Sequence, residues 1–188
     1  MTVYFEKVSR FADVDLPMPE RATANSAGYD LVVAEDIVIP PYDFTHTKIQ
    51  DKVFEDSRHE DYYGFVNPFT LDEVAKLTKD LKSKITLVST GMKCHLNPNQ
   101  YLEISARSST PLKHWLIIGN AVGIIDSDYC DNPDNEGEIF FQVINLLPFA
   151  IQLKRGDKIG QGIIKTYGVT DNDKASGNRE GGFGSTSM

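Results

Sequence analysis

The chain has 188 residues, 40% hydrophobic and 24% charged, which is enough to bury one sizeable core. Its formal net charge of −8 argues against broad nucleic-acid binding, which needs a basic surface. The sequence contains neither an apolar run of membrane-spanning length nor a signal-peptide pattern at its start. Cys94 and Cys130 are too few and too unpatterned for a disulfide framework or a zinc motif. We therefore expect a reducing, cytoplasmic setting.

Most of the chain has the pattern of short strands separated by Gly, Pro and Asn. Residues 17–28 are irregular and predict a surface loop. The predicted strands lie at about 3–8, 29–33, 37–41, 86–90, 92–96, 101–105, 139–144 and 158–164. Many short strands with a single helix predict a mainly β fold, a sandwich or a barrel.

The segment 44–85 differs from the rest in being rich in charged and aromatic residues. It contains one predicted helix at about 70–82, because Thr70 and Glu73 have capping-box spacing ahead of an apolar face. We interpret the segment as an insertion into a β domain spanning 1–168. Packing of the helix on its own domain is the simpler interpretation, and docking of a protein partner is the alternative.

Residues 119–129 run from an apolar stretch into acidic turn formers. This pattern predicts a buried strand that delivers Asp126 and Tyr129 to a hairpin. A carboxylate at the end of an apolar strand is partly desolvated, which favours a general base. An ordinary turn with solvated aspartates fits the same residues.

Arg107, Ser108 and Ser109 follow an alternating strand, so a guanidinium and two hydroxyls are expected at its end. Such groups bind phosphate oxygens, although a solvated arginine in a turn is the simpler interpretation of this motif alone. Standard calcium-loop, P-loop, dinucleotide and nucleophile-elbow motifs are absent, and the four histidines are scattered without ligand spacing.

The last segment, 169–188, is rich in Asp, Asn, Gly and Ser without periodicity, which predicts a flexible arm. Near its end, glycines allow backbone amides to turn toward an anion, and Ser185 and Thr186 add donors. Phe183 lies among glycines with no core to join, so a flat ligand face suits its ring.

Taken together, the motifs resemble those of the trimeric dUTPase family, deoxyuridine 5′-triphosphate nucleotidohydrolases. Five motifs occur in the family's order, at 27–31, 107–109, 119–129, 156–161 and 179–186. The resemblance implies a distorted jelly roll and a homotrimer whose active sites are each assembled from several subunits. It also implies hydrolysis of dUTP to dUMP and pyrophosphate, which controls dUTP levels and supplies the dTMP precursor.

The resemblance further implies a role for each matching residue. Asp126 would activate the water that attacks the α-phosphorus, and the arm would close over the active site. Mg²⁺ would be held through the triphosphate and water, with Asp30 at most an indirect partner and no direct protein ligand. The substrate-binding residues implied are Arg107, Ser108, Ser109, Asn120, Ile124, Ile125, Tyr129, Phe140, Gln161, Arg179, Phe183, Gly184, Ser185 and Thr186.

The chain departs from the family pattern in the insertion 44–85, at Ala106, where proline or glycine is frequent, and in three further places. Arg179 lies one residue closer to Phe183 than is usual, the connection 131–136 is longer, and Gly160 replaces the usual alanine. Two alternatives follow. The first is dCTP deamination, which needs a glutamate where this chain has Gln142; the second is a regulatory protein that retains the nucleotide site.

Overall fold

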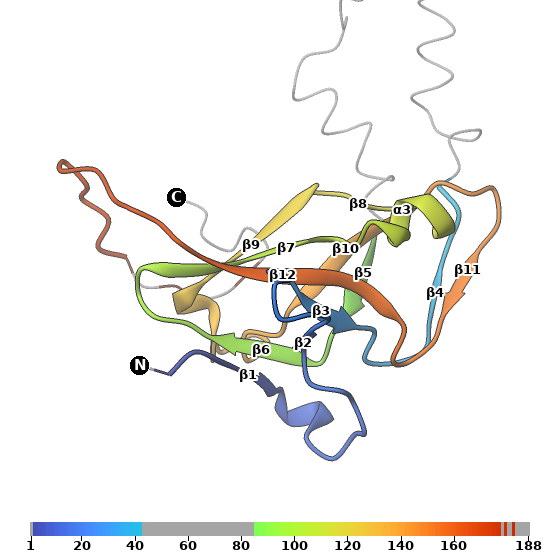
Figure 1. Cartoon of the computed structure of the whole chain (residues 1–188), viewed down its shortest axis with the longest axis horizontal. Helices are drawn as coiled ribbons and strands as arrows, with labels where there is room; N and C mark the ends of the chain where they lie inside the picture. Colours follow the sequence, from blue (N-terminus) through green and yellow to red (C-terminus); the bar gives the residue numbers. More distant parts are fainter. Residues whose placement is uncertain (1, 43–84, 178, 180–181, 183–188) are drawn as a thin grey trace, which may run out of the picture.

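The computed structural model of the chain describes residues 2–42, 85–177, 179 and 182. Within these ranges the chain is mainly β, with short helical turns between strands (Figure 1). The strands are β1 (Tyr4–Lys7), β2 (Glu20–Arg21), β3 (Tyr29–Val32), β4 (Ile37–Ile39), β5 (Thr86–Ser89), β6 (Met92–His95), β7 (Gln100–Ala106), β8 (Leu116–Ile118), β9 (Val122–Asp126), β10 (Phe140–Asn145), β11 (Ile151–Leu153) and β12 (Lys158–Thr166). The helical elements are η1 (Ser9–Phe11), α3 (Ser109–His114) and η3 (Ser127–Tyr129).

The largest sheet has the order β2-β3-β12-β7-β9, and a second sheet has the order β5-β10-β8. Two further pairs, β1-β6 and β11-β4, complete the described part of the fold. All of these named strand pairs are antiparallel, and many join strands that are distant in sequence. This arrangement is the jelly-roll type that the sequence predicts.

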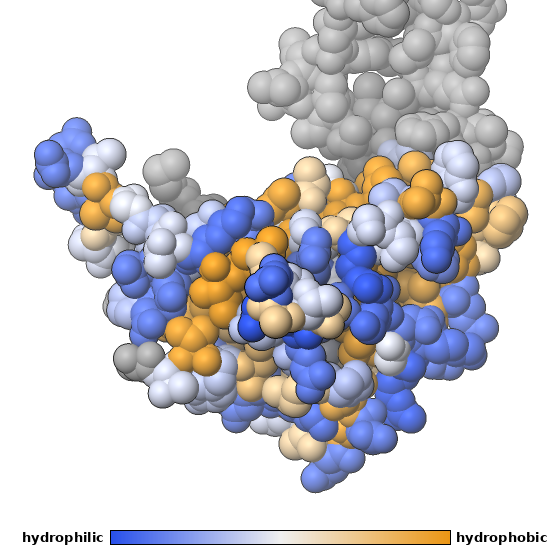
Figure 2. All heavy atoms as spheres, viewed as in Figure 1, coloured by the Kyte–Doolittle hydropathy of each residue, from blue (hydrophilic) through white to orange (hydrophobic). Residues whose placement is uncertain are grey.

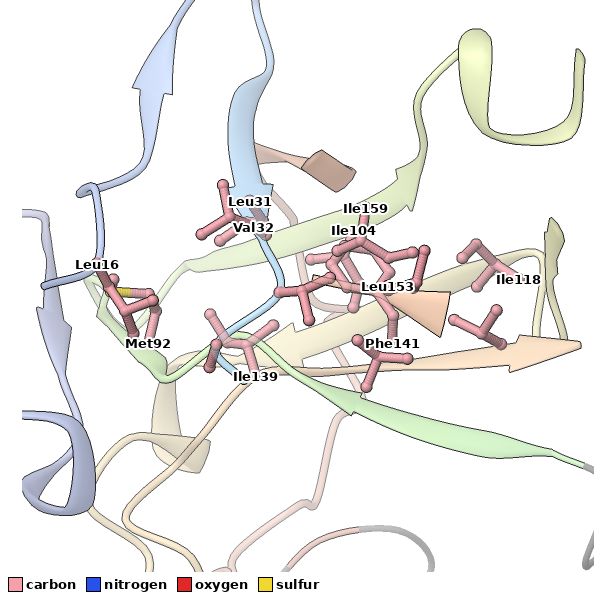
Figure 3. Close-up of a cluster of buried hydrophobic side chains, with 14 of the residues drawn as sticks. Leu16, Leu31, Val32, Met92, Ile104, Ile118, Ile139, Phe141, Leu153 and Ile159 are labelled. Carbon is pink, nitrogen blue, oxygen red and sulfur yellow. The ribbon is translucent and has the colours of Figure 1, made fainter. Parts of the chain in front are cut away.

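One continuous core lies between the two largest sheets (Figure 3). Strand β7 alternates, so Leu102 and Ile104 are buried, and Phe141 and Val143 of β10 are buried in the same way. Each such side chain stabilises the fold by about 1.5–3 kcal/mol relative to its exposed state.

Gly160 of β12 lies directly against the Phe141 ring of β10 in this core. An ideal Cβ at this position would lie 2.3 Å from Cζ of Phe141 and 2.8 Å from the carbonyl oxygen of Ser105. The Phe141 ring therefore occupies the space that a methyl group would need. The glycine that replaces the family's usual alanine is matched to this large ring.

The structure confirms the predicted strands and corrects three local predictions. The expected loop 17–28 contains the short strand β2, and α3 was not predicted because a single turn and a half carries no periodic signal. Strand β9 is an edge strand with Val122 and Ile124 exposed, rather than a buried strand. It is not paired with β10, which lies in the other sheet, so the predicted hairpin is also wrong.

The predicted helix at 70–82 and most of the segment 44–85 lie outside the described residues. Among the residues that the structure describes, no helix is long and apolar enough to cross a membrane.

Figure 2 shows that the outer surface carries apolar side chains among the polar ones. Large exposed examples are Val122 and Ile124 on β9, and Leu112 and Trp115 in and after α3. Apolar groups exposed together on one chain are typical of a surface that another protein covers.

Candidate active site

A pocket of about 190 Å³ lies beside β9, at the edge of the five-stranded sheet. Its walls come from β7, β9, η3 and β10 together with two residues of the C-terminal arm. The lining residues are Ile104, Asn120, Gly123, Ile124, Ile125, Asp126, Tyr129, Phe140, Gln142, Arg179 and Gly182.

Asp126 is the last residue of β9 and the only carboxylate among these described lining residues. Its Oδ2 accepts a hydrogen bond from Nη2 of Arg179, and Oδ1 of Asp128 accepts one from Nε of the same guanidinium at 2.7 Å. The Asp126 side chain is 48% exposed. The desolvated setting predicted from the sequence is therefore not present in the single chain.

Tyr129 forms an aromatic wall of the pocket and is only 6% exposed. Its hydroxyl donates a hydrogen bond to the carbonyl oxygen of Glu138 at 3.1 Å and accepts one from Nδ2 of Asn135 at 2.8 Å. Burial raises the pKa of this hydroxyl above its ordinary value, so it stays protonated near neutral pH. The ring is thus fixed in place by both packing and hydrogen bonds.

The arm crosses directly over this ring. The Arg179 guanidinium lies 5.9 Å from the centroid of Tyr129. An ideal Cβ on Gly182 would lie 2.7 Å from Cε2 of Tyr129, so only glycine allows the arm to pass so close. The remaining predicted arm residues, Phe183, Gly184, Ser185 and Thr186, lie outside the described residues.

The residues expected to read a base also line this pocket: Asn120, Ile124, Ile125 and Phe140. Asn120 precedes Ala121, which adopts a left-handed backbone conformation with φ of 58°, in the turn that leads into β9.

Three lining residues, Ile104, Gly123 and Gln142, were missing from the predicted site. Gln142 lies two positions after Phe140 on β10, so strand alternation predicts that both face the same side. The alternation of Phe140 and Gln142 could therefore have predicted Gln142 from the sequence. Gly123 lies opposite Ile104 in the β7–β9 register, and that pairing emerges only from the fold.

A second group of predicted residues gathers at the far end of β7. Asp30 is 13% exposed and bridges two cations, with Oδ1 2.9 Å from Nε of Arg107 and Oδ2 2.7 Å from Nζ of Lys158. The Gln161 side chain lies against Gly28, where an ideal Cβ would be 2.3 Å from its Oε1. Lys158 was not among the predicted site residues, although it lies within the 156–161 motif that resembles the family.

Ser108 and Ser109 lie where β7 gives way to α3, directly after Arg107. One carboxylate between two cations leaves a net positive charge, which favours an anionic ligand. This end of the strand is therefore suited to phosphate.

The two groups are well separated within one chain. In the antiparallel register Asp126 pairs with Tyr101 at the start of β7, whereas Arg107 follows Ala106 at its other end. The strand from Tyr101 to Ala106 spans about 17 Å at 3.3 Å per residue. A single pocket cannot contain both Asp126 and Arg107 of the same chain.

The longer connection that follows Tyr129 is well ordered by its own hydrogen bonds. Nδ2 of Asn132 donates to the carbonyl oxygen of Tyr129 at 2.8 Å, and Oδ1 of Asn132 accepts from the amide of Asp134 at 3.0 Å. Asn135 of the same connection donates to the Tyr129 hydroxyl at 2.8 Å, so the extra residues help to hold this side chain.

The fold and the pocket define a β protein with an aromatic-walled small-molecule site and a separate cationic end. Comparison with known proteins narrows this class. The dUTPase family model matches residues 73–187. The deoxyuridine 5′-triphosphate nucleotidohydrolase of Lactococcus lactis subsp. lactis is 30% identical over 184 residues, covering 97% of this chain and 95% of that protein.

Solved dUTPase structures are also similar to this chain. The dUTPase of Streptococcus mutans is 30% identical with a TM-score of 0.66, over 90% of this chain and 99% of that one. The dUTPase of phage phi11 of Staphylococcus aureus shares the fold at 16% identity, with a TM-score of 0.59 over 94% and 97% of the two chains. The chain belongs to the dUTPase family.

Proposed function

We propose that the chain is a dUTP diphosphatase that hydrolyses dUTP to dUMP and pyrophosphate. The observation that carries this proposal is the placement of Asp126 at the mouth of a pocket whose wall is the buried ring of Tyr129. A flat wall and a nearby carboxylate are what selective binding of a nucleoside and activation of a water molecule require.

In this reaction the Asp126 carboxylate accepts a proton from a water molecule as the water oxygen bonds to the α-phosphorus. The bond from that phosphorus to the β-phosphate oxygen breaks, and pyrophosphate leaves with those electrons. Asp126 is bonded to Arg179, so the guanidinium must release it when the water binds. Arg179 is then free to bind a phosphate oxygen.

The roles of the other pocket residues are inferred from where each of them lies in the pocket. The buried Tyr129 ring packs under the deoxyribose and excludes a ribose 2′-hydroxyl. Asn120 and the backbone of Ile124 and Ile125 read the uracil edge, beside Phe140. Cytosine is rejected because its amino group leaves such polar partners unpaired.

Arg107, Ser108, Ser109 and Gln161 bind the phosphates, and Phe183 closes over the base while Gly184, Ser185 and Thr186 bind the terminal phosphate. Since Arg107 lies about 20 Å along the chain from Tyr101, the register partner of Asp126, at 3.3 Å per residue, these two residues must come from different chains. A homotrimer with shared sites meets this requirement, and the exposed apolar residues of β9 support such an assembly.

Mg²⁺ is the metal that the family generally uses. Both oxygens of Asp30 are already bound to cations, so this carboxylate does not offer a direct ligand. This donor set fits a metal held through the triphosphate and water, where it neutralises charge on the phosphates.

The deciding experiment is a pyrophosphate-release assay with dUTP, dCTP, dTTP and UTP, each with and without Mg²⁺. Release from dUTP alone, stimulated by Mg²⁺, is expected. Ammonia release from dCTP would instead indicate a deaminase, and nucleotide binding without turnover would indicate a regulatory protein.

Asp126→Asn is expected to bind dUTP and to lose turnover by on the order of a hundredfold or more, because the amide cannot accept the proton. Asp128→Asn is the matched control, since it also removes a partner of Arg179 but leaves the base. Near-normal turnover of the Asp126 variant would refute the assignment.

A further inference from the structure

A cluster of polar side chains lies on the outer face of the β1–β6 pair, away from the pocket. Tyr4 pairs with His95 and Glu6 with Lys93, so strand alternation places all four on one face. Cys94 lies between Lys93 and His95 on β6, so its side chain points to the opposite face, where it is buried in the core.

The connection after η3 brings two more groups to this face. Sγ of Cys130 lies 3.6 Å from Nδ1 of His95. One ligand atom each from His95, Cys130 and Asp131 lies within 4.8 Å of the other two. In a tetrahedral zinc site with ordinary bond lengths, sulfur and nitrogen ligands are about 3.5 Å apart. The observed separation matches this value without rearrangement.

His95 is already oriented as a metal ligand would be. Its Nε2 lies 2.7 Å from Oε2 of Glu6, and its ring stacks on Tyr4 with centroids 4.2 Å apart and planes 11° apart. Metal-binding histidines usually donate the second ring N–H to a carboxylate, which fixes the tautomer. Glu6 thus leaves the lone pair of Nδ1 directed toward Cys130.

We propose that His95, Cys130 and Asp131 form a binding site for a zinc-class divalent cation, with Glu6 as the residue that positions His95. Nitrogen, sulfur and one carboxylate are the donors that zinc prefers, whereas Mg²⁺ prefers oxygen alone. Asp131 is 59% exposed, so the site is accessible and water can take the fourth position.

The local charges are compatible with such an ion. A thiolate and a carboxylate together neutralise a divalent cation. Lys93 lies 2.5 Å from Oδ1 of Asp131 and 3.6 Å from Oε2 of Glu6, so these two carboxylates share the balancing of its charge. The thiol of Cys130 loses its proton on binding, and its thiolate adds the third negative charge around the ion.

Co²⁺ is the probe for the test, because a bound thiolate gives it an intense near-ultraviolet charge-transfer band. The full-length protein is titrated with Co²⁺ under reducing conditions, and Zn²⁺ is then added in competition. We expect one ion per chain, a thiolate band, and loss of that band on stoichiometric addition of Zn²⁺.

Cys130→Ser is expected to abolish the band, and His95→Gln to weaken binding at least tenfold. Glu6→Gln should weaken it about 10–100-fold, as is usual for the carboxylate partner of a ligating histidine. Cys94→Ala and His114→Gln are the matched controls, since they remove the other cysteine and an exposed histidine outside the cluster.

Absence of a thiolate band in the wild-type protein would overturn the proposal, as would a band that survives in Cys130→Ser. Equal binding by the wild type and His95→Gln would do the same. Circular dichroism of each variant shows whether it is folded, and the Glu6→Gln variant keeps the test valid if a ligand variant unfolds, since it retains all three ligands.

Discussion

Tyr129 shows how one side chain serves both the fold and the pocket. Its ring is covered by Gly182 on one side, and its hydroxyl is bonded to the backbone of Glu138 and to Asn135. We therefore expect the ring to affect the choice of substrate and the hydroxyl to affect stability. Two substitutions of Tyr129 separate these effects.

Tyr129→Ala should admit UTP, because removal of the ring opens space for the ribose 2′-hydroxyl. Tyr129→Phe should keep discrimination but lower the free energy of unfolding by about 1 kcal/mol, since the Glu138 carbonyl loses its donor. The measurements are the kcat/KM ratio for dUTP over UTP and urea unfolding. Unchanged discrimination in the alanine variant would show that the ring does not exclude the ribose.

At the residue scale, the sequence indicated which residues share the candidate pocket better than it indicated their surroundings. Asp126, Tyr129 and Asn120 all line one pocket, as their shared motif implied. The half-exposed state of Asp126 and its bond to Arg179 were not predictable, because both depend on where the arm lies in space. The shortened spacing to Phe183 gave no indication of that contact.

At the scale of elements, the approach of β12 to β10 depends on a single glycine. Gly160→Ala should destabilise the fold by about 1–3 kcal/mol, because its methyl group would overlap the buried Phe141 ring. Gly168→Ala is the matched control, since an ideal Cβ there meets nothing within 4 Å. Chemical unfolding measures both, and equal stability of the two variants would contradict the packing argument.

The arm is the second element with a separable role. Removal of residues 178–188 deletes Arg179 and Gly182, which line the pocket and are not members of the hydrophobic core cluster. We expect a large loss of turnover with the oligomer intact, measured by steady-state kinetics and size-exclusion chromatography. Full activity without the arm would dismiss Phe183 and Arg179 from the mechanism.

Strand periodicity predicted most of the strands, because alternation or continuous apolar runs mark them, but it missed the short strands β2, β8 and β11. It failed for β9, where Val122 and Ile124 were interpreted as core residues but are exposed at a sheet edge. The sequence alone does not distinguish apolar residues at a sheet edge from buried ones, because both give the same apolar pattern. The short α3 was missed for a different reason, since six residues give too few turns for a periodic signal.

At the scale of the whole molecule, one chain holds all the described parts of the site but not in one place. Asp126 and Arg107 are held at opposite ends of β7. The exposed apolar residues on β9 and around α3 are available to the homotrimer that we propose. Whether the segment 44–85 docks a further protein stays a hypothesis, since it lies almost wholly outside the described residues.

The length of β7 has a genetic consequence. If every site takes Asp126 from one chain and Arg107 from another, two inactive variants should complement each other. Asp126→Asn and Arg107→Ala, each inactive when purified alone, should regain about a quarter of wild-type activity when co-expressed in equal amounts and randomly assembled. Mixing the two after purification should restore activity only as fast as subunits exchange. No recovery in co-expressed, mixed oligomers would mean that each chain catalyses alone.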